Sequence, residues 1–259
     1  MVIISGLQYD PLVLWQFLTS FLIGTTSHSI TTYSQKELQT RLSAGSSLIR
    51  MGDGEVMLMT GRDIHYQSVS KQLAKQLHLI IDSYTTDGTY ILSLPVEAVA
   101  LRDTELRSKH RFRIWRLFRV FFSVRMNDSL PYADAHLFYH QNAFETYVRP
   151  VITDKHVICV SKKDNLTPQL VTTLKATART VHLIENPSHD AYDHIDRLIA
   201  EIDTVLKTDA NTKKWTMLVS SGPAGKVLAH HYATRGIQTL DIGHGLEIIG
   251  QNKDYSDRI

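Results

Sequence analysis

The chain repeats one pattern three times: a short apolar run, a loop, a helix-length segment and a second short apolar run. The paired runs, which we predict to be strands, cover residues 47–51 and 90–94, 156–160 and 181–184, and 215–219 and 237–242. Parallel strands need long crossovers, which helices supply, so this alternation predicts an α/β fold with a largely parallel, twisted sheet and helices on both faces. The loops at the carboxyl ends of the strands then meet at one edge of the sheet, where such folds bind ligands.

Helices are predicted over residues 70–84, 167–178, 190–206 and 223–234 from apolar spacing and from start and stop signals. A further helix is predicted after Ser34, because Glu37 stands three residues later and completes a capping box.

The composition excludes several classes of protein. Among 259 residues, 43% are hydrophobic and 21% are charged, which is typical of a globular protein rather than a disordered one. Cys159 is the single cysteine, so neither an intramolecular disulfide nor a cysteine-based zinc cluster can form, and we expect a cytoplasmic setting. The net charge of +2 does not favour a nucleic-acid-binding protein.

Residues 1–34 are interpreted as an N-terminal extension that contains an apolar helix. The segment 11–24 is strongly apolar, but it is shorter than the roughly 20 residues that span a bilayer. No Lys or Arg precedes it, so the charged start of a signal peptide is missing. We expect a buried or partner-facing helix, with a membrane-surface helix as the alternative.

Residues 102–125 combine basic and aromatic side chains, with eight Lys or Arg against two acidic residues. Trp115, Phe118 and Phe122 share one face of the helix that this spacing predicts. Two interpretations stay open: a solvated basic face over a buried aromatic face, or a surface for an anionic acceptor or for acidic lipid at the inner side of a membrane.

The segment from Gly52 to Glu55 is the first candidate site. Asp53 and Glu55 follow a predicted strand, and in an extended chain their carboxylates would point the same way. Paired carboxylates suit Mg²⁺ or Mn²⁺, with substrate phosphates and water completing the ligand shell. The alternative is an Asp-Gly turn followed by a helix-capping Glu. Gly52 and Gly54 would admit a bulky ligand, and Arg50 could pair with Asp53 or contact phosphate.

A second candidate, Ser221-Gly222-Pro223, joins a predicted strand to a helix, whose free amides favour an anion. It lacks the Gly-Lys-Ser/Thr that follows in a Walker A motif. A third, Gly243-His244, follows the last predicted strand, where His244 could act as an acid or base, contact phosphate or bind a metal. Each could instead be ordinary loop structure, but a parallel sheet would bring all three candidates to one edge.

Three segments of the chain together resemble the GT-D type of glycosyltransferase, a domain also known as DUF1792. The resemblance lies in the run 47–55, in 185–195, and most closely in 221–244. It covers roughly residues 38–249 and is weak between 96 and 152. Where the family typically has an aromatic residue, this chain has Met51. The Asp-x-Glu motif of the family maps onto Asp53 and Glu55, and its C-terminal His maps onto His244.

The resemblance implies a Rossmann-like fold, a nucleotide-sugar donor that is usually UDP-linked, and a divalent metal, Mn²⁺ or Mg²⁺, held by Asp53 and Glu55. Residues 35–259 would form a single glycosyltransferase domain. The acceptor would be a glycan, glycoprotein or polysaccharide. The protein could also form an oligomer. The alternatives are a non-catalytic partner subunit of the same fold that binds a nucleotide or sugar phosphate, and a nucleotidyl- or phosphotransferase.

Overall fold

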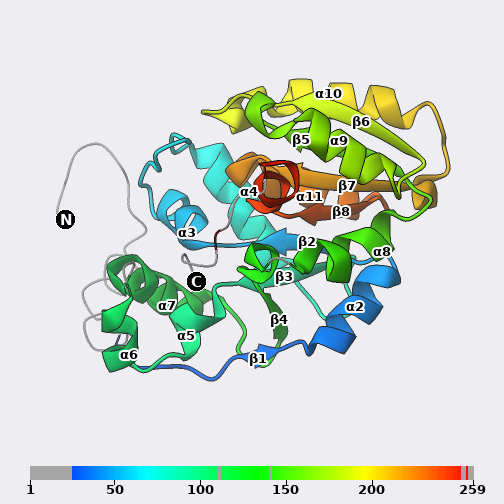
Figure 1. Cartoon of the computed structure of the whole chain (residues 1–259). Coiled ribbons are helices and arrows are strands. Elements are labelled where there is room, and N and C mark those ends of the chain that lie inside the picture. The colour runs from blue at the N-terminus through cyan, green and yellow to red at the C-terminus, as the bar shows by residue number, and fades with distance from the viewer. Residues whose placement is uncertain (1–24, 110–111, 141, 252–254, 256–259) are drawn as a thin grey trace.

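The computed structural model describes residues 25–109, 112–140, 142–251 and 255, and these residues build one eight-stranded sheet in the order β1-β4-β3-β2-β8-β7-β5-β6. The strands are β1 (Thr31–Thr32), β2 (Ser47–Arg50), β3 (Tyr90–Leu94), β4 (Pro131–Asp134), β5 (His156–Ser161), β6 (Thr180–Glu185), β7 (Trp215–Ser220) and β8 (Gln238–Asp241). Every strand pair is parallel, which confirms the predicted α/β fold. The sheet crosses the molecule with helices on both sides (Figure 1).

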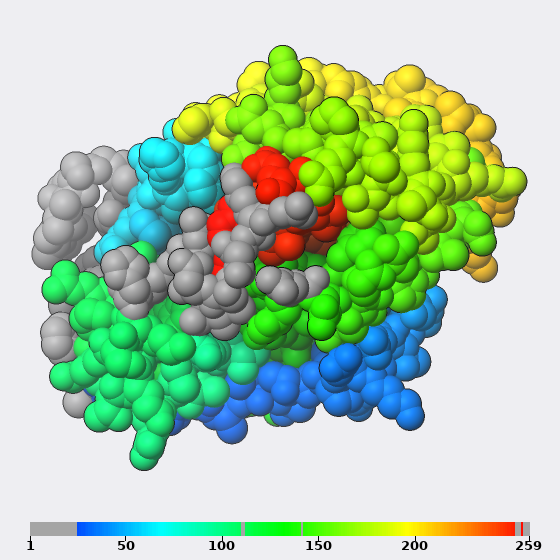
Figure 2. Space-filling view, viewed as in Figure 1, coloured from blue at the N-terminus to red at the C-terminus, as the bar shows by residue number. Residues whose placement is uncertain are grey.

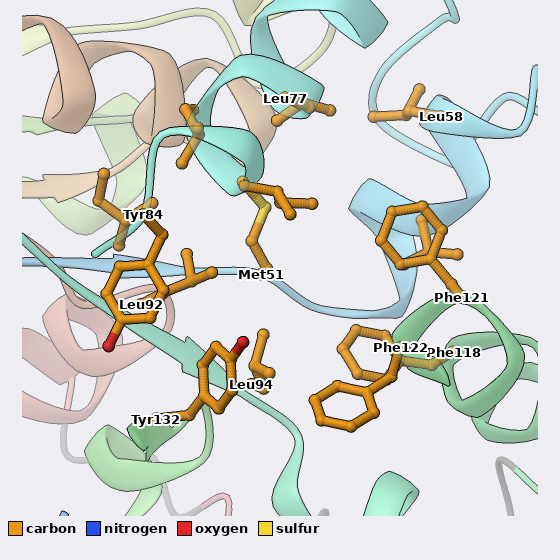
Figure 3. Close-up of a cluster of buried hydrophobic side chains, with 14 of the residues drawn as sticks. Met51, Leu58, Leu77, Tyr84, Leu92, Leu94, Phe118, Phe121, Phe122 and Tyr132 are labelled. Carbon is orange, nitrogen blue, oxygen red and sulfur yellow. The ribbon is translucent and has the colours of Figure 1, made fainter. Parts of the chain in front are cut away.

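One face of the sheet is covered by helices that pack mainly on β2 and β3 and, through α10 and α11, on β5 and β7. These helices are α3 (Asp53–Met59), α4 (Lys71–Asp82), α5 (Val96–Ala100), α6 (Asp103–Ser108), α7 (Phe112–Arg125), α10 (Ile195–Leu206) and α11 (Gly222–Ala233). In Figure 3, Met51 at the end of β2 lies in the same cluster as Leu77 of α4 and Phe122 of α7. Apolar side chains of α4 and α7 therefore cover the end of β2, from which the chain enters α3.

The opposite face is covered by a second cluster that includes Leu42, Leu170 and Leu246, all fully or almost fully buried. Its helices are α2 (Gln35–Ser43), α8 (Arg149–Ile152), α9 (Pro168–Lys175) and α12 (Gly245–Gln251). Short helical segments complete the chain: η1 (Leu137–Tyr139), η2 (Phe144–Val148), η3 (Lys163–Asn165), η4 (Ala191–His194) and η5 (Thr212–Lys214). The capping box at Ser34 is present as predicted, and α2 begins directly after it.

The centre of the sheet is a topological switch point. β2 and β8 are neighbours, with Leu48 paired to Leu240, and the strand order runs outward from them in both directions. The chain leaves β2 toward one face, through α3 and α4, and leaves β8 toward the other face, through α12. Diverging connections leave a crevice at the carboxyl ends of the two strands, which is the usual ligand position in such sheets.

The two N-terminal predictions have different outcomes. The predicted apolar helix within 11–24 lies outside the described residues. The strand β1 falls within residues 1–34 and pairs with β4, so the sheet includes part of the segment that we assigned to an extension. Across the described ranges, no helix is long and apolar enough to cross a bilayer.

The basic aromatic stretch forms α6 and α7, and Trp115, Phe118 and Phe122 are buried on one face as predicted. Several of its cations are used within the fold. Arg119 is fully buried and donates to the carbonyl oxygens of Ala98 and Leu101, and Arg116 pairs with Asp103. These contacts favour the interpretation of a packed helix with a charged outer face.

Candidate active site

The Gly52–Glu55 segment begins helix α3 and is not extended, so the prediction that the two carboxylates point the same way is wrong. Gly52 is the N-cap residue, and its N–H donates to Glu55 Oε2 at 2.8 Å. Asp53 Oδ1 accepts the N–H of Gly54 at 3.0 Å. The N–H groups at the start of a helix lack partners within the helix, and carboxylates satisfy them, so the interpretation of Glu55 as a helix-capping residue is confirmed. Asp53 and Gly54 belong to the first turn of α3 and do not form a separate turn. Glu55 is 5% exposed, whereas Asp53 is half-buried at the edge of the sheet.

Glu55 belongs to a buried ionic cluster that the sequence did not reveal. Lys226 Nζ lies 3.2 Å from Glu55 Oε1 and 3.2 Å from Asp241 Oδ2, and all three side chains are nearly inaccessible. Burial alone would lower the pKa of Lys226, but the charges of Asp241 and Glu55 outweigh it and raise that pKa above its ordinary value. Lys226 therefore stays charged and connects α11 to α3 and to the end of β8. In the sequence, the only indication of its burial was that Lys226 stands among apolar residues of a predicted helix.

Arg50 and Gly243 join the first and third candidate segments. The backbone N–H of Arg50 donates to Asp241 Oδ2 at 3.2 Å, and its Nε donates to the carbonyl oxygen of Ala135 at 2.7 Å. The guanidinium lies directly against Gly243, where a Cβ would stand 1.5 Å from Arg50 Nη1. Gly243 also has φ +50°, so both space and backbone conformation require glycine there. Arg50 thus bridges the ends of β2, β4 and β8.

Tyr66 lies over the start of α11 and is the second residue that the sequence analysis missed. A Cβ at Gly222, whose φ is +53°, would stand 2.9 Å from Tyr66 Cε2, and one at Gly54 would stand 3.8 Å from the Tyr66 hydroxyl. Although 43% of Tyr66 is exposed, burial of its hydroxyl end and the charge of Glu55 raise its pKa to about 12. An accessible aromatic ring therefore contacts the first two candidate segments.

The loop that carries Tyr66 is fastened to the loop after β6. Asp190 Oδ1 accepts the N–H of Ser68 at 2.6 Å, and the Tyr66 carbonyl oxygen accepts the N–H of Asp190 at 3.0 Å. Tyr192 N–H donates to Gln67 Oε1 at 3.1 Å. These contacts give the run 185–195 a role in the fold that its resemblance to the family did not specify.

Ser221 and Pro223 shape the α11 start from inside the protein. Ser221 is 4% exposed, and its hydroxyl donates to Asn186 Oδ1 at 2.9 Å. Pro223 is buried in the first helical turn, where proline costs no hydrogen bond. Gly222 is therefore the member of this predicted trio that lies closest to the surface.

His244 lies at the end of β8, next to the β2 end. Its ring is 5.8 Å from the ring of Tyr139, and the Arg50 guanidinium is 5.6 Å from the same Tyr139 ring. His244 Nδ1 faces Glu247 Oε1 at 3.3 Å. The three candidate segments therefore meet at the switch point, as the topology predicted. Figure 2 shows cyan residues and the red C-terminal residues on the same face of the molecule.

The donor set at this edge sets limits on how a metal could be held. The Glu55 carboxylate already accepts the N–H of Gly52 and pairs with Lys226, so it is suited to binding an ion indirectly, through a water molecule. Asp53, half-buried and at the sheet edge, fits direct contact. Within the described ranges no group of three His, Cys, Asp or Glu side chains forms a metal site. Mg²⁺ commonly takes one or two carboxylates and substrate phosphates, so this set is compatible with an ion that arrives with its substrate.

Comparison with solved structures places this fold among known ones. A structure described as "The highly conserved domain of unknown function 1792 has a distinct glycosyltransferase fold" matches with a TM-score of 0.70 and 21% identity, covering 93% of this chain and 87% of that one. A second, "A New Glycosyltransferase (DUF1792) from Streptococcus sanguinis", matches with a TM-score of 0.67 and 20% identity, covering 88% and 87%. At such identities these matches show the shared fold.

Two curated relatives match by sequence. "Glycosyltransferase GlyD" of Streptococcus pneumoniae serotype 4 is 24% identical in an alignment of 216 positions that covers 77% of this chain and 25% of that protein. "Probable glycosyl transferase Gly" of Streptococcus gordonii is 24% identical in an alignment of 214 positions that covers 78% of this chain and 30% of that protein. The chain thus spans less than a third of the length of these relatives.

A family-level match covers most of the chain. The family model named "Glycosyltransferase GT-D fold" matches residues 48–249, a range that begins within β2 and ends in α12. It includes the three segments that meet at the switch point. This chain therefore belongs to the GT-D family of glycosyltransferases.

Proposed function

We propose that this chain is a metal-dependent glycosyltransferase that moves a sugar from a UDP-linked donor to a glycan, glycoprotein or polysaccharide acceptor. One observation carries the proposal: the starts of α3 and α11 and the end of β8 converge at the switch point of a parallel sheet, through Tyr66 and Lys226. The names of the family and of the relatives supply the reaction class.

The chemistry requires that negative charge be stabilised on the departing nucleoside diphosphate. The N–H groups at the start of α11 that lack an intrahelical partner would donate to phosphate oxygens, and the helix dipole adds favourable potential there. A divalent ion, Mn²⁺ or Mg²⁺, would neutralise the diphosphate when bound. Asp53 would contact that ion directly and Glu55 would act through water.

The donor would lie across the crevice with its diphosphate near Gly222. Tyr66 offers an accessible ring against Gly222, suited to stacking on the nucleobase of the donor. Arg50, fixed over Tyr139, places a permanent positive charge between the β2 and β8 ends. His244 would reach the reacting end of the donor from the β8 side.

A non-catalytic partner subunit is the competing function, and one observation favours it: Lys226 already neutralises Glu55. Such a protein would bind a nucleotide sugar without turning it over. The two functions differ in a single measurable quantity, which is nucleotide release.

The decisive experiment is a donor screen that measures nucleotide release from UDP- and GDP-sugars with Mn²⁺, with Mg²⁺ and with a chelator. Release that needs the metal and is abolished in Asp53→Asn supports the proposal. Asp87→Asn, at an exposed turn, is the matched control and should retain full activity. Binding without release supports the partner subunit, and full activity in chelator contradicts the metal role.

A further inference from the structure

His244 and Glu247 form a pair in which a buried carboxylate faces one nitrogen of a half-exposed imidazole. The His244 side chain is 41% exposed and that of Glu247 is 7% exposed, with Nδ1 to Oε1 at 3.3 Å. Among the described residues, none forms a hydrogen bond with Nε2 of His244. Within the part of the chain that the structure describes, Nε2 of His244 is therefore open to a ligand.

Glu247 is held from several sides. The Tyr255 hydroxyl donates to Oε2, Lys162 Nζ lies 3.6 Å from Oε1, and Asn165 Nδ2 donates to Oε1 at 3.5 Å. Burial would raise the pKa of Glu247, but the hydrogen bonds from His244 and Tyr255 and the charge of Lys162 outweigh it and hold that pKa well below its usual range. An ionised carboxylate only accepts hydrogen bonds, so the proton of a neutral His244 lies on Nδ1 and the lone pair on Nε2.

The ring is also fixed in orientation. Tyr255 lies against it at 4.8 Å between ring centroids, and Tyr139 at 5.8 Å. Tyr139 in turn carries the Arg50 guanidinium, so the imidazole is connected to the β2 end through one aromatic side chain. A fixed tautomer and a fixed ring orientation are what a carboxylate partner provides to a histidine that acts as a general base.

We propose that Glu247 is a positioning residue that makes His244 the general base for the acceptor hydroxyl, so that transfer inverts the anomeric configuration. This inference rests on the proposed glycosyltransferase function. The acceptor hydroxyl gives its proton to Nε2 as its oxygen bonds to the anomeric carbon. The bond from that carbon to the diphosphate oxygen breaks on the opposite side, and the electron pair leaves with the nucleoside diphosphate. Glu247 stabilises the imidazolium that forms.

A purely structural role for the pair is the alternative. α12 begins at Gly245, and the Glu247 N–H donates to the His244 carbonyl oxygen at 2.9 Å, so the pair could simply start that helix. A helix-start role predicts a loss of stability in variants but no change in the stereochemistry of transfer, the pH profile of kcat or its response to imidazole.

The test uses the full chain with UDP-α-glucose, UDP-α-galactose or UDP-α-N-acetylglucosamine as donor and p-nitrophenyl glycosides as acceptors. Proton NMR of the product should show a β linkage. His244→Ala should lower kcat by roughly 10²-fold or more, and added imidazole should restore part of the loss. Glu247→Gln should lower kcat by roughly tenfold or more with little change in donor KM.

The pH profile separates positioning from structure. Glu247, Tyr139 and Tyr255 face His244, and Lys162 also faces Glu247. In Glu247→Gln the acidic limb of kcat should move to lower pH, because loss of the adjacent negative charge disfavours the imidazolium. Tyr255→Phe, which keeps the ring and loses the hydroxyl, should show a smaller loss of kcat and covers the case in which Glu247→Gln does not fold.

Matched controls are His194→Ala and Glu201→Gln at exposed positions, which should retain wild-type kcat. A retained α linkage, or unchanged kcat in His244→Ala, overturns this inference and leaves the glycosyltransferase function standing. Absence of nucleotide release from every donor in the wild-type protein contradicts the proposed function itself.

Discussion

Lys226 links the two sides of the site through single contacts to Glu55 and Asp241. Removing the ammonium would leave two buried carboxylates without their cation, which is among the costliest changes in a protein interior. The cluster also explains why the Glu55 side chain points into the protein, toward Lys226, and does not lie beside the Asp53 side chain. The stability of this edge of the sheet therefore depends on the balance of the buried charges beneath it.

We expect Lys226→Met to lower the free energy of unfolding by about 3–5 kcal/mol, the usual range for breaking a buried ion pair. Urea denaturation measures this directly. Lys207→Met, at an exposed position on the C-terminal side of α10, should stay within about 0.5 kcal/mol of wild type. Equal stability of the two variants would mean that the buried carboxylates do not depend on Lys226.

Tyr66 provides a second residue-scale prediction. If its ring stacks on the donor base, Tyr66→Ala should raise the donor KM or Kd by roughly tenfold, since stacking on an aromatic side chain contributes about 1–3 kcal/mol. Tyr66→Phe keeps the ring and should bind the donor as wild type does. Equal affinity in the alanine variant would remove Tyr66 from the donor site.

Glu247 makes stability depend on pH in a defined direction. Its folded-state pKa is lowered from an ordinary value of 4.5, so its ionised form contributes stability above that value. The contribution is lost as the pH falls below about 4.5 toward the folded-state pKa. The stability gap between wild type and Glu247→Gln should therefore be full at pH 7 and shrink in acid, as thermal unfolding at several pH values can show. A gap that widens in acid would contradict the assignment.

At the scale of elements, α7 shows which charges are structural. Arg116 pairs with Asp103, whose side chain is 14% exposed, whereas Arg113 is exposed and forms no ion pair within the described part of the chain. An aromatic face under a basic face was predictable from spacing. The sequence did not predict which arginines form contacts within the fold, because that depends on where α6 and the end of α5 pack against α7.

Arg116→Glu should therefore destabilise the protein by about 2–4 kcal/mol, because it places a carboxylate against Asp103. Arg113→Glu should leave stability within about 0.5 kcal/mol, and it is the variant suited to testing an anionic acceptor or lipid surface. Thermal unfolding of the two variants checks the first claim. Donor hydrolysis and acceptor use, compared in Arg113→Glu, check the second.

The six strands with apolar runs were predictable within about a residue. In the five that lie inside the sheet, burial on both faces leaves a continuous apolar signal, whereas β6 is a partly exposed edge strand. β4 was missed because Pro131 and Asp134 bound a run of only two apolar residues. α3 was missed because Gly52 and Gly54 disfavour a helix locally, and the hydrogen bond from the Gly52 N–H to Glu55 at the helix start offsets that preference. Tyr66, Lys226 and Glu247 had no motif, and only tertiary packing brings them to the site.

At the scale of the whole molecule, the switch point decides where chemistry can occur. Because β2 and β8 are adjacent and their connections leave toward opposite faces, residues that are almost 200 positions apart in the sequence become neighbours. The motifs on these two strands were predictable individually. Their contact through Arg50 and Gly243 follows from the strand order, which depends on the complete chain.

The central claim is that the carboxyl edge of the sheet at the switch point binds a nucleoside diphosphate together with a divalent ion at Asp53. Calorimetric titration of UDP into the full chain, with Mn²⁺ and with a chelator, measures it most directly. We predict binding in Mn²⁺ that weakens at least roughly tenfold in chelator and in Asp53→Asn, while Asp87→Asn binds as wild type. UDP affinity that is the same in all four conditions would contradict the account.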